Sequence, residues 1–577
     1  MDIRNTVERL RLRLAGQRGA LVLAALGIAC GVLAGAVTVA FRATIEIAQR
    51  FIVPRGFDAL TDEMRLALPV MGAVLALLVM IWLGRGRLRT GVAHVLERLS
   101  YNEGQLPLRN AALQFFGGAL VLIFGMALGR EGPSVHLGAA SGSQLGRWVR
   151  IPHNSLRTLV GCGVAAAIAA SFNTPLAGVA FALEVVLMEF AVGDLTPVIL
   201  AAVSGATVGR LSYGSSTAFL VPPMSLVSLW ELPYIVAMGV AIGALAAAFI
   251  VLVRELTRAT CRRPWWLRII AAGVLIGGCG VMVPEVMGIG YDTVNLALVG
   301  RYALGTLAAI AAVKLFATGI GIAAGLPGGL IGPSLVMGAA AGGVMGHIGT
   351  GLAPVATSEI GLYAMLGMGA MMGATLQAPL AALLALIELT GDLNIVLPGM
   401  LAVVSATLVA KEVFACESVF IMQMRALGLD HSNDPVAQKL RRIGVTAVMS
   451  RAFRTTTQRV SPAQAATLLE GTPQWIVVAA DHDKVLLLAA DLARHLESGP
   501  AAEIDLLDIP AHRRTLARIH GEATLQAGLD LLERANTEAL YVEGPGAAYD
   551  SEILGVLTRE QIDASYRYMP AALPAEQ

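Results

Sequence analysis

Two stretches of this chain, residues 129–146 and 329–346, carry one pattern of glycine, proline and small residues within long apolar surroundings. Each opens with Gly-x-x-Gly-Pro-Ser, but the first copy alone holds a charge pair, Arg130-Glu131, where the second has Leu330-Ile331. Such a repeat predicts a duplicated structural unit, and the charge pair marks a position at which the copies differ in chemistry. The recurring glycines are Gly129, Gly132, Gly138, Gly142 and Gly146 in the first copy and Gly329, Gly332, Gly338, Gly342 and Gly346 in the second.

A second pair of segments extends the repeat. Residues 174–184 resemble residues 378–388, and each segment runs from a Pro-Leu-Ala sequence to a glutamate, Glu184 or Glu388. Duplicated membrane units commonly pack about a pseudo-two-fold axis, with the substrate site where the units meet. We therefore expect one repeat over about residues 20–210 and another over about 230–425.

The composition places most of the chain in a lipid bilayer. Only 14% of the residues are charged, whereas water-soluble proteins carry about 25%. Some apolar segments reach the ~20 residues that cross a bilayer, and others are shorter or interrupted by glycine and proline. Residues 20–427 are predicted to form an all-α, polytopic membrane domain with broken helices, preceded by an amphipathic cytosolic helix over residues 1–19.

Basic residues mark the predicted cytoplasmic side of the membrane. They cluster in residues 4–18, 85–89, 147–157 and 254–268. Because positively charged loops stay in the cytoplasm, both termini are expected there. The formal net charge of +1 argues against a nucleic-acid partner, and the five cysteines are scattered singly, without the spacing of a metal or redox site.

Beyond about residue 427 the composition becomes that of a soluble domain. Charged residues are more frequent, and the apolar runs shorten to strand length. The order helix, strand, strand occurs twice, so residues 428–577 are predicted to form a small α/β cytosolic domain of two similar halves. The predicted strands are Trp475–Ala479, Val485–Leu488, Ala539–Val542 and Ile553–Leu557, and the predicted helices are Ser461–Leu469 and Ala523–Arg534.

The repeated Gly-x-x-Gly-Pro-Ser pattern suits the first turn of a helix. Glycine permits close backbone approach, and proline fits the first helical turn. A helix start leaves N–H groups unpaired and carries roughly half a positive charge, so inside a membrane it can bind an anion without a fixed cation. Two such starts, one per repeat, can hold a dehydrated halide between backbone dipoles and still release it.

Glu131 is the candidate gate of such a site. Its carboxylate responds to the same positive potential as an anion, so the ionised form can occupy the anion's place and the protonated form can leave it. Arg130 could instead hold Glu131 in an ion pair, or the two charges could only pack helices together. An ionisable residue inside a membrane is functional by default, and the unmatched position of Glu131 in the repeat favours the gate.

The motif Gly129-Arg-Glu-Gly-Pro133 resembles the signature of the CLC family of chloride channels and proton/chloride exchangers, and Gly328–Pro333 resembles another of its pore motifs. The resemblance covers about residues 20–427. It implies an inverted repeat, a homodimer with one pore per subunit, a bacterial inner-membrane location and Glu131 as the external gate. The tail, which opens with Val445-Thr-Ala-Val-Met449, is similar to the CBS-domain pair that many members carry.

The resemblance also implies an anion-binding set, from which this chain departs in part. In the motif at residues 89–93, Thr90 keeps a hydroxyl, while a glycine and a proline are missing. Ile331 replaces an aromatic residue. Phe420 stands where the family's pore tyrosine donates a hydroxyl, so a pore less tightly closed on its cytoplasmic side is expected, with chloride as the default anion. The residues carried over as anion-binding are Thr90, Arg130, Gly132, Leu330, Ile331 and Phe420.

Exchangers of the family usually place a proton-relaying glutamate at the position of Val185, and valine has no proton to transfer. Glu184 beside it matches Glu388 in the repeat, so both are assigned a structural role. A passive anion channel is therefore favoured, with a proton-coupled antiporter as the alternative and a CBS-regulated cation channel as a further one. The sequence contains no nucleophile, metal cluster or phosphate loop in a plausible context, so we expect no enzymatic activity.

Three further polar residues lie in the membrane part. His136 follows Glu131 by about one and a half helical turns and is either a pH sensor or a packing residue, and His94 offers the same two readings. Lys314 is expected to pair with a carboxylate or with the carboxyl end of a helix.

The tail departs from the family's nucleotide-binding pattern. Neither Val485–Asp491 nor Gly555–Gln561 carries the complete Gly-x-x-Thr-x-x-Asp sequence of CBS pairs that bind adenine nucleotides. We expect a dimer-stabilising module without a resident cofactor, and nucleotide regulation is the alternative.

Overall fold

The structure is a computed structural model in which the backbone contacts divide the chain into two compact units. One comprises Met1–Ile151 and Ser155–His431, and the other comprises Ser432–Gln577 with Pro152–Asn154. The helix expected over residues 1–19 lies outside the described residues except at Gly19. The structure describes residues 19–566 apart from 85–88, 103, 191, 216–218, 220, 223, 353–357, 427–428, 430–439, 441–442, 480–483, 500–502, 522 and 544–552.

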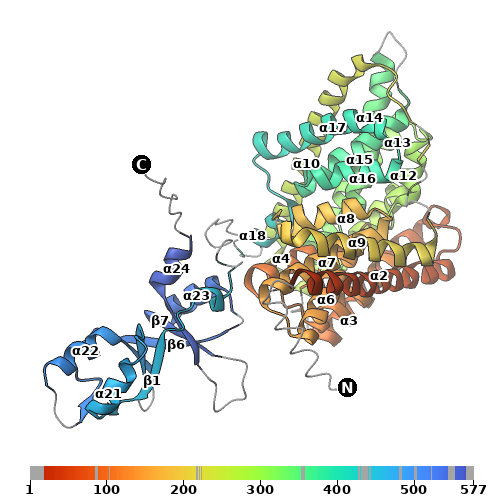
Figure 1. The fold of residues 1–577 in the computed structure, drawn as a ribbon. Coiled ribbons are helices and arrows are strands. Elements are labelled where there is room, and N and C mark those ends of the chain that lie inside the picture. The colour runs from red at the N-terminus through yellow and green to blue at the C-terminus, as the bar shows by residue number, and fades with distance from the viewer. Residues whose placement is uncertain are drawn as a thin grey trace, which may run out of the picture. The chain divides into compact units, whose positions relative to one another are not determined.

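The first unit contains two successive sets of helices (Figure 1). The first set is α2 (Gly19–Ile52), α3 (Asp62–Gly84), α4 (Gly91–Tyr101), α5 (Leu108–Ile123), α6 (Glu131–Val149), α7 (His153–Phe172), α8 (Pro175–Phe181) with its extension η2 (Ala182–Leu187), and α9 (Val192–Tyr213). The second set is α10 (Leu232–Thr260), α11 (Trp265–Met282), α12 (Tyr291–Leu298), α13 (Leu304–Ala324), α14 (Ile331–Leu352), α15 (Ile360–Leu376), α16 (Pro379–Thr390), and α17 (Val396–Leu408) with its extension η6 (Val409–Val413). The short helices η1 (Phe57–Ala59), η3 (Leu229–Glu231), η4 (Pro284–Val286) and η5 (Leu393–Ile395) lie between them, and α18 (Val419–Ala426) follows.

The two sets have matching internal contacts. Helix α2 packs on α9 as α10 packs on α17, and α3 packs on α5 as α11 packs on α13. The extensions η2 and η6 are both π-helical, but they lie at different places in the two sets, since η2 follows α8 and η6 follows α17. The duplication predicted from the glycine pattern is therefore present in the fold.

The repeated glycines also allow neighbouring helices to cross closely. A Cβ on Gly138 of α6 would lie 2.2 Å from the carbonyl oxygen of Gly163 in α7. In the second set, a Cβ on Gly338 of α14 would lie 2.4 Å from the carbonyl oxygen of Gly367 in α15. Small residues let helix backbones approach in lipid, where packing rather than the hydrophobic effect drives association.

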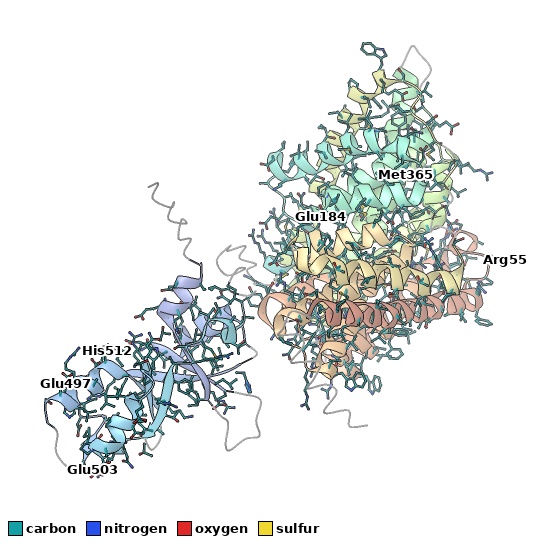
Figure 2. The ribbon with its side chains drawn as sticks, in the orientation of Figure 1. Arg55, Glu184, Met365, Glu497, Glu503 and His512 are labelled. Atoms are coloured by element: carbon teal, nitrogen blue, oxygen red, sulfur yellow. The ribbon has the colours of Figure 1, made fainter. Side chains whose placement is uncertain are left out.

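The surface of the helical unit suits a bilayer. Within the described ranges, nine helices are long and apolar enough to cross a membrane, and α5, α15 and α16 are shorter apolar helices. Large apolar side chains such as Phe51, Trp82 and Leu211 are largely exposed on these helices. Met365, by contrast, is fully buried in α15 (Figure 2). This mixture of full and short helices confirms the predicted polytopic domain with broken helices.

The second unit holds a six-stranded sheet among its described residues, in the order β1-β3-β4-β6-β7-β8. Each half has the order strand, helix, strand, strand, helix. The first half is β1 (Phe453–Thr457), α21 (Pro462–Leu469), β3 (Trp475–Ala479), β4 (Lys484–Leu488) and α22 (Ala489–Glu497). The second half is β6 (Arg514–His520), α23 (Leu525–Ala535), β7 (Ala539–Glu543), β8 (Ile553–Thr558) and α24 (Arg559–Tyr566). The short elements are α20 (Val445–Val448), β2 (Arg459–Val460) and β5 (Ile504–Asp505).

The four predicted strands and both predicted helices of this unit are confirmed within two residues at each end. Strands β1 and β6 were not predicted. They pair in parallel with β3 and β7, one in each half. Their sequences, Phe-Arg-Thr-Thr-Thr and Arg-Thr-Leu-Ala-Arg-Ile-His, are mostly polar and lack the continuous apolar run that marks a buried strand.

Candidate anion pathway

The two glycine-rich helix starts meet inside the helical unit. The N–H of Gly129 donates to the carbonyl oxygen of Gly329 at 2.7 Å, and the N–H of Gly329 donates to that of Gly129 at 2.8 Å. A Cβ on Gly132 would lie 2.7 Å from the Cα of Gly329, so the backbones touch here. Helices α6 and α14 begin directly beyond this bridge, and the positive ends of their dipoles lie side by side.

The Glu131 side chain occupies the junction of the two helix starts. It is completely buried. One carboxylate oxygen, Oε2, accepts the N–H of Gly332 at 3.0 Å, and the other, Oε1, accepts the phenol hydrogen of Tyr291. The carboxylate of the first repeat is thus bound at the amino-terminal end of the helix that belongs to the second repeat.

Arg130 does not form the ion pair with Glu131 that was one of the alternatives considered from the sequence. Its guanidinium pairs instead with Glu46 of α2 at 3.3 Å and lies over the ring of Tyr291 at 5.0 Å. Glu46 also binds Arg42 at 2.6 Å. Arg130 precedes α6, and its side chain turns toward α2, which packs along α6.

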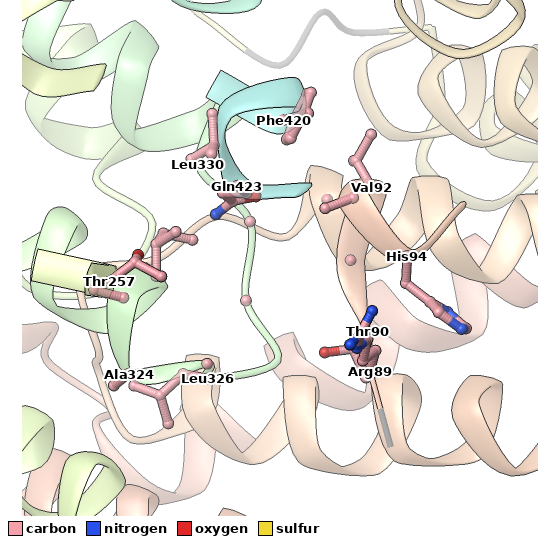
Figure 3. A pocket seen from close by; sticks show the side chains of 18 of the residues that line it. Arg89, Thr90, Val92, His94, Thr257, Ala324, Leu326, Leu330, Phe420 and Gln423 are labelled. Carbon is pink, nitrogen blue, oxygen red and sulfur yellow. The ribbon is translucent and has the colours of Figure 1, made fainter. Parts of the chain in front are cut away.

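A cavity of about 290 Å³ lies next to this junction (Figure 3). The first residues of four helices contribute to its wall, through Gly91 of α4, Gly132 of α6, Leu330 before α14 and Phe420 of α18. Each helix start carries a partial positive charge, so the cavity can hold an anion without a cationic side chain at its centre.

Four of the six predicted anion-binding residues line this one cavity, namely Thr90, Gly132, Leu330 and Phe420. Arg130 and Ile331 are absent from the described lining residues. Ile331 is almost fully buried as the first residue of α14, so its side chain packs into the core. Thr90 caps the start of α4 without a side-chain capping bond, which leaves its hydroxyl available to a ligand.

The charged residues of the described cavity wall are mostly basic. The wall includes Arg89, Arg268 and His94, and its one described carboxylate, Glu97, pairs with Arg89 at 3.0 Å. Gln114 fixes the start of α4 because its oxygen accepts the N–H of Gly91 at 2.7 Å.

The structure brings His94 and His136 together. His94 Nδ1 and His136 Nε2 are 2.8 Å apart, and Arg98 Nε donates to His94 Nε2 at 3.3 Å. Arginine only donates, so His94 Nε2 accepts and His94 carries its hydrogen on Nδ1, which donates to His136. Neutral His136 therefore carries its hydrogen on Nδ1, a buried atom for which the described residues offer no partner.

Glu184 and Glu388 cap helices of the opposite repeat. The carboxylate of Glu184 accepts the N–H groups of Leu380 and Ala381 at 3.1 and 2.7 Å, at the start of α16. Glu388 does the same at the start of α8, where both distances, to Leu176 and Ala177, are 2.9 Å. This reciprocal arrangement explains why both repeats carry the glutamate.

Val185 and Lys314 are both buried; Val185 packs in the apolar core, and Lys314 binds backbone carbonyl oxygens. Val185 lies buried in η2, next to Glu184 (Figure 2 labels the latter). Lys314 is buried in α13, and its ammonium donates at 2.8 Å to the carbonyl oxygens of Val286 and Gly288. The carbonyl of Val286 ends the short helix η4, in agreement with the expected helix carboxyl end.

Sequence reasoning missed Tyr291, the first residue of α12. Its ring contacts Phe219 at a centroid distance of 4.9 Å and its hydroxyl reaches the Glu131 carboxylate. The signal that the sequence did offer was Gly288-Ile-Gly290 directly before Tyr291, since paired glycines often precede a helix start, and the structure gives both glycines positive φ.

A profile described as voltage gated chloride channel matches residues 71–411, which is more than half of the chain. The chain belongs to this family, the CLC family. Its membrane part is therefore a CLC-fold helical domain for chloride transport, and the CLC motif Gly129–Pro133 begins at the bridge between the two repeats described above.

Curated relatives agree with this assignment. A protein of Ralstonia nicotianae with the name "Putative chloride channel protein ClcB-like" is 32% identical over 352 residues, which cover 60% of this chain and 82% of the relative. A protein of Vibrio cholerae named as the H(+)/Cl(-) exchange transporter ClcA is 32% identical over 309 residues, covering 52% of this chain and 66% of the relative.

Solved structures share the fold. A slow cyanobacterial Cl-/H+ antiporter superposes with a TM-score of 0.62 at 21% identity, covering 70% of this chain and 98% of its own. A eukaryotic CLC transporter gives a TM-score of 0.60 at 20% identity and covers 93% of this chain and 97% of its own. A CLC-type fluoride/proton antiporter gives 0.59 at 25% identity, covering 70% and 98%.

Proposed function

We propose that this protein exchanges chloride for protons across a membrane and that Glu131 is the gate of its anion pathway. The observation that carries this proposal is the Glu131 carboxylate bound to the N–H of Gly332, where the starts of α6 and α14 meet. An ionised carboxylate at that place competes with a chloride ion for the same backbone donors, and a protonated one competes weakly. Proton binding to Glu131 and anion entry are thereby linked.

The Ralstonia nicotianae relative carries the name of a chloride channel protein, but the names of three other similar proteins favour exchange over the passive channel expected from the sequence. The Vibrio cholerae relative is named as an H(+)/Cl(-) exchange transporter. Two of the solved structures are described as a cyanobacterial Cl-/H+ antiporter and a CLC-type fluoride/proton antiporter. In such a cycle, a proton neutralises Glu131, the side chain leaves, an anion takes its place, and release of the proton restores the block.

Passive anion conduction is the second candidate. It is favoured by Val185, which cannot pass a proton, and by Phe420, which offers no hydroxyl to close the cavity. The cation-channel alternative has little support, because the one described carboxylate in the cavity wall, Glu97, is neutralised by Arg89.

Reconstituted vesicles test this proposal. With a chloride gradient across the vesicle membrane, we expect protons to move against their own gradient in a fixed ratio to chloride. Glu131→Gln should remove the proton movement and flatten the pH dependence of chloride flux, whereas Glu359→Gln, a change at an exposed carboxylate, should leave both unchanged. Chloride flux without proton movement in the unaltered protein would favour the channel. A pH response that survives Glu131→Gln would exclude Glu131 as the gate.

We further propose the membrane orientation and assembly that the sequence implies. Arg89 and Arg268, which line the cavity, belong to the basic clusters that mark the cytoplasmic side, so the cavity is the inner part of the pathway. The protein acts as a homodimer in a bacterial inner membrane with both termini in the cytoplasm. The tail is a CBS pair whose role is to stabilise the dimer, and transport needs no resident cofactor.

A further inference from the structure

Tyr291 makes a contact with the gate that the family motifs do not contain. Its hydroxyl donates to Oε1 of Glu131, while the N–H of Gly332 donates to Oε2, so each carboxylate oxygen has its own donor. The two donors come from different helices of the second repeat, α12 and α14. Glu131 is completely buried, whereas the Tyr291 ring is only partly buried.

We propose that Tyr291 is a positioning residue that holds ionised Glu131 in the blocking position and thereby sets the pH at which the pathway opens. The inference rests on the proposed gate function of Glu131. A phenol donates a stronger hydrogen bond to a carboxylate than to a neutral carboxylic acid. The contact therefore stabilises the blocked, ionised state more than the protonated one. As a result, a lower pH is needed before Glu131 leaves the blocking position and the pathway opens.

The surroundings of Tyr291 keep its hydroxyl aimed at the gate. Its ring centroid is 4.9 Å from that of Phe219 and 6.2 Å from that of Phe172, and the guanidinium of Arg130 lies over the ring at 5.0 Å. Arg130 is in turn held by Glu46 at 3.3 Å. A cation over the ring also favours donation by the phenol hydroxyl.

The segment that leads into α12 is fixed as well. Lys314 donates to the carbonyl oxygens of Val286 and Gly288, and a Cβ on Gly290 would lie 3.3 Å from its ammonium nitrogen. Among the described residues, Arg130 and Lys314 interact electrostatically with Glu131, and Glu46 pairs with Arg130. All three remain when only the phenol oxygen of Tyr291 is removed, so that change isolates the hydrogen bond from the surrounding charges.

The variant Tyr291→Phe tests the proposal, because it keeps the ring and removes the donor. Chloride flux of reconstituted protein is measured from pH 4 to 8. We expect the flux–pH curve of Tyr291→Phe to move toward higher pH by about one to two units, with an unchanged maximum at acid pH. The matched control is Tyr234→Phe, which removes a phenol that donates to the carbonyl of Met345, away from the gate; its curve should coincide with that of the unaltered protein.

A second comparison separates this inference from the proposed function. In a Glu131→Gln background, Tyr291→Phe should have no effect on the flux–pH curve, because no titrating gate is left to hold. An unshifted curve for Tyr291→Phe in the otherwise unaltered protein would overturn the role of Tyr291 and leave the gate in place. A shift of equal size in the Glu131→Gln background would also overturn it. Persisting pH dependence in Glu131→Gln alone would instead reject the gate.

Discussion

Gly129 and Gly329, one from each repeat, donate backbone hydrogen bonds to each other at 2.7 and 2.8 Å. This small antiparallel bridge joins the halves of the membrane unit at the point where α6 and α14 begin. Because both strands of the bridge lead directly into helices, the two partial positive charges lie together, and Glu131 reaches from one helix start to the other.

The close backbone approach at this junction predicts a severe effect of Gly132→Ala. The added Cβ would lie 2.7 Å from the Cα of Gly329, and a backbone atom cannot yield as a flexible side chain can. We expect at least a tenfold loss of chloride flux in vesicles, with the protein still inserted in the membrane. Gly278→Ala is the control, since a Cβ at Gly278 of α11 meets nothing within 4 Å. Equal flux for both variants would contradict the tight junction.

Phe420→Tyr should strengthen anion binding in the cavity. Phe420 lines the same cavity as Leu330 and Thr90 (Figure 3), and a hydroxyl at Phe420 would supply a donor to a bound anion. A hydrogen bond to a charged group contributes about 1.5–3 kcal/mol, so chloride affinity measured by calorimetry should rise by about tenfold or more. Phe414→Tyr, at a half-exposed position, serves as the control. Unchanged affinity would mean that the anion does not reach Phe420.

The reciprocal caps predict a loss of stability on truncation. Glu184→Ala and Glu388→Ala each remove two hydrogen bonds to the first turn of a helix in the other repeat. Each change should cost about 1–2 kcal/mol and lower the melting temperature of the detergent-solubilised protein. Glu359→Ala is a matched control, because Glu359 occupies the capping position of α15 without a capping bond. A control that melts as early as the two variants would remove the basis for this prediction.

The tail offers a prediction about pH. The backbone N–H of Leu507 and the amide of Gln458 donate to Asp505 and lower the pKa of its carboxyl below the ordinary 3.8. A lowered pKa in the folded state gives stability that is present above pH 3.8 and lost as the pH falls through the folded value. Hydrogen exchange of the full-length protein should show protection of the Leu507 amide that fades in acid. Asp505→Asn keeps an oxygen that accepts the Leu507 N–H but does not titrate, so the protection should no longer fade in acid, whereas Asp508→Asn should leave the fading unchanged.

The sequence alone determined the features that depend on local pattern. Apolar length and scarcity of charge predicted the membrane domain, the spaced glycines predicted its duplication, and the alternation of short apolar runs predicted the paired halves of the tail. The helix-start pattern of Gly129–Pro133 also predicted the gate position, because helix starts and their dipoles are set by residues adjacent in the chain.

Only the tertiary structure decided which groups meet Glu131. Tyr291 is 160 residues from Glu131, and Arg130 pairs with Glu46 across 84 residues rather than with its neighbour. No periodicity links such positions, since their contact depends on how whole helices pack against one another. The cavity wall likewise combines four helix starts, from α4, α6, α14 and α18, and packing alone places them together.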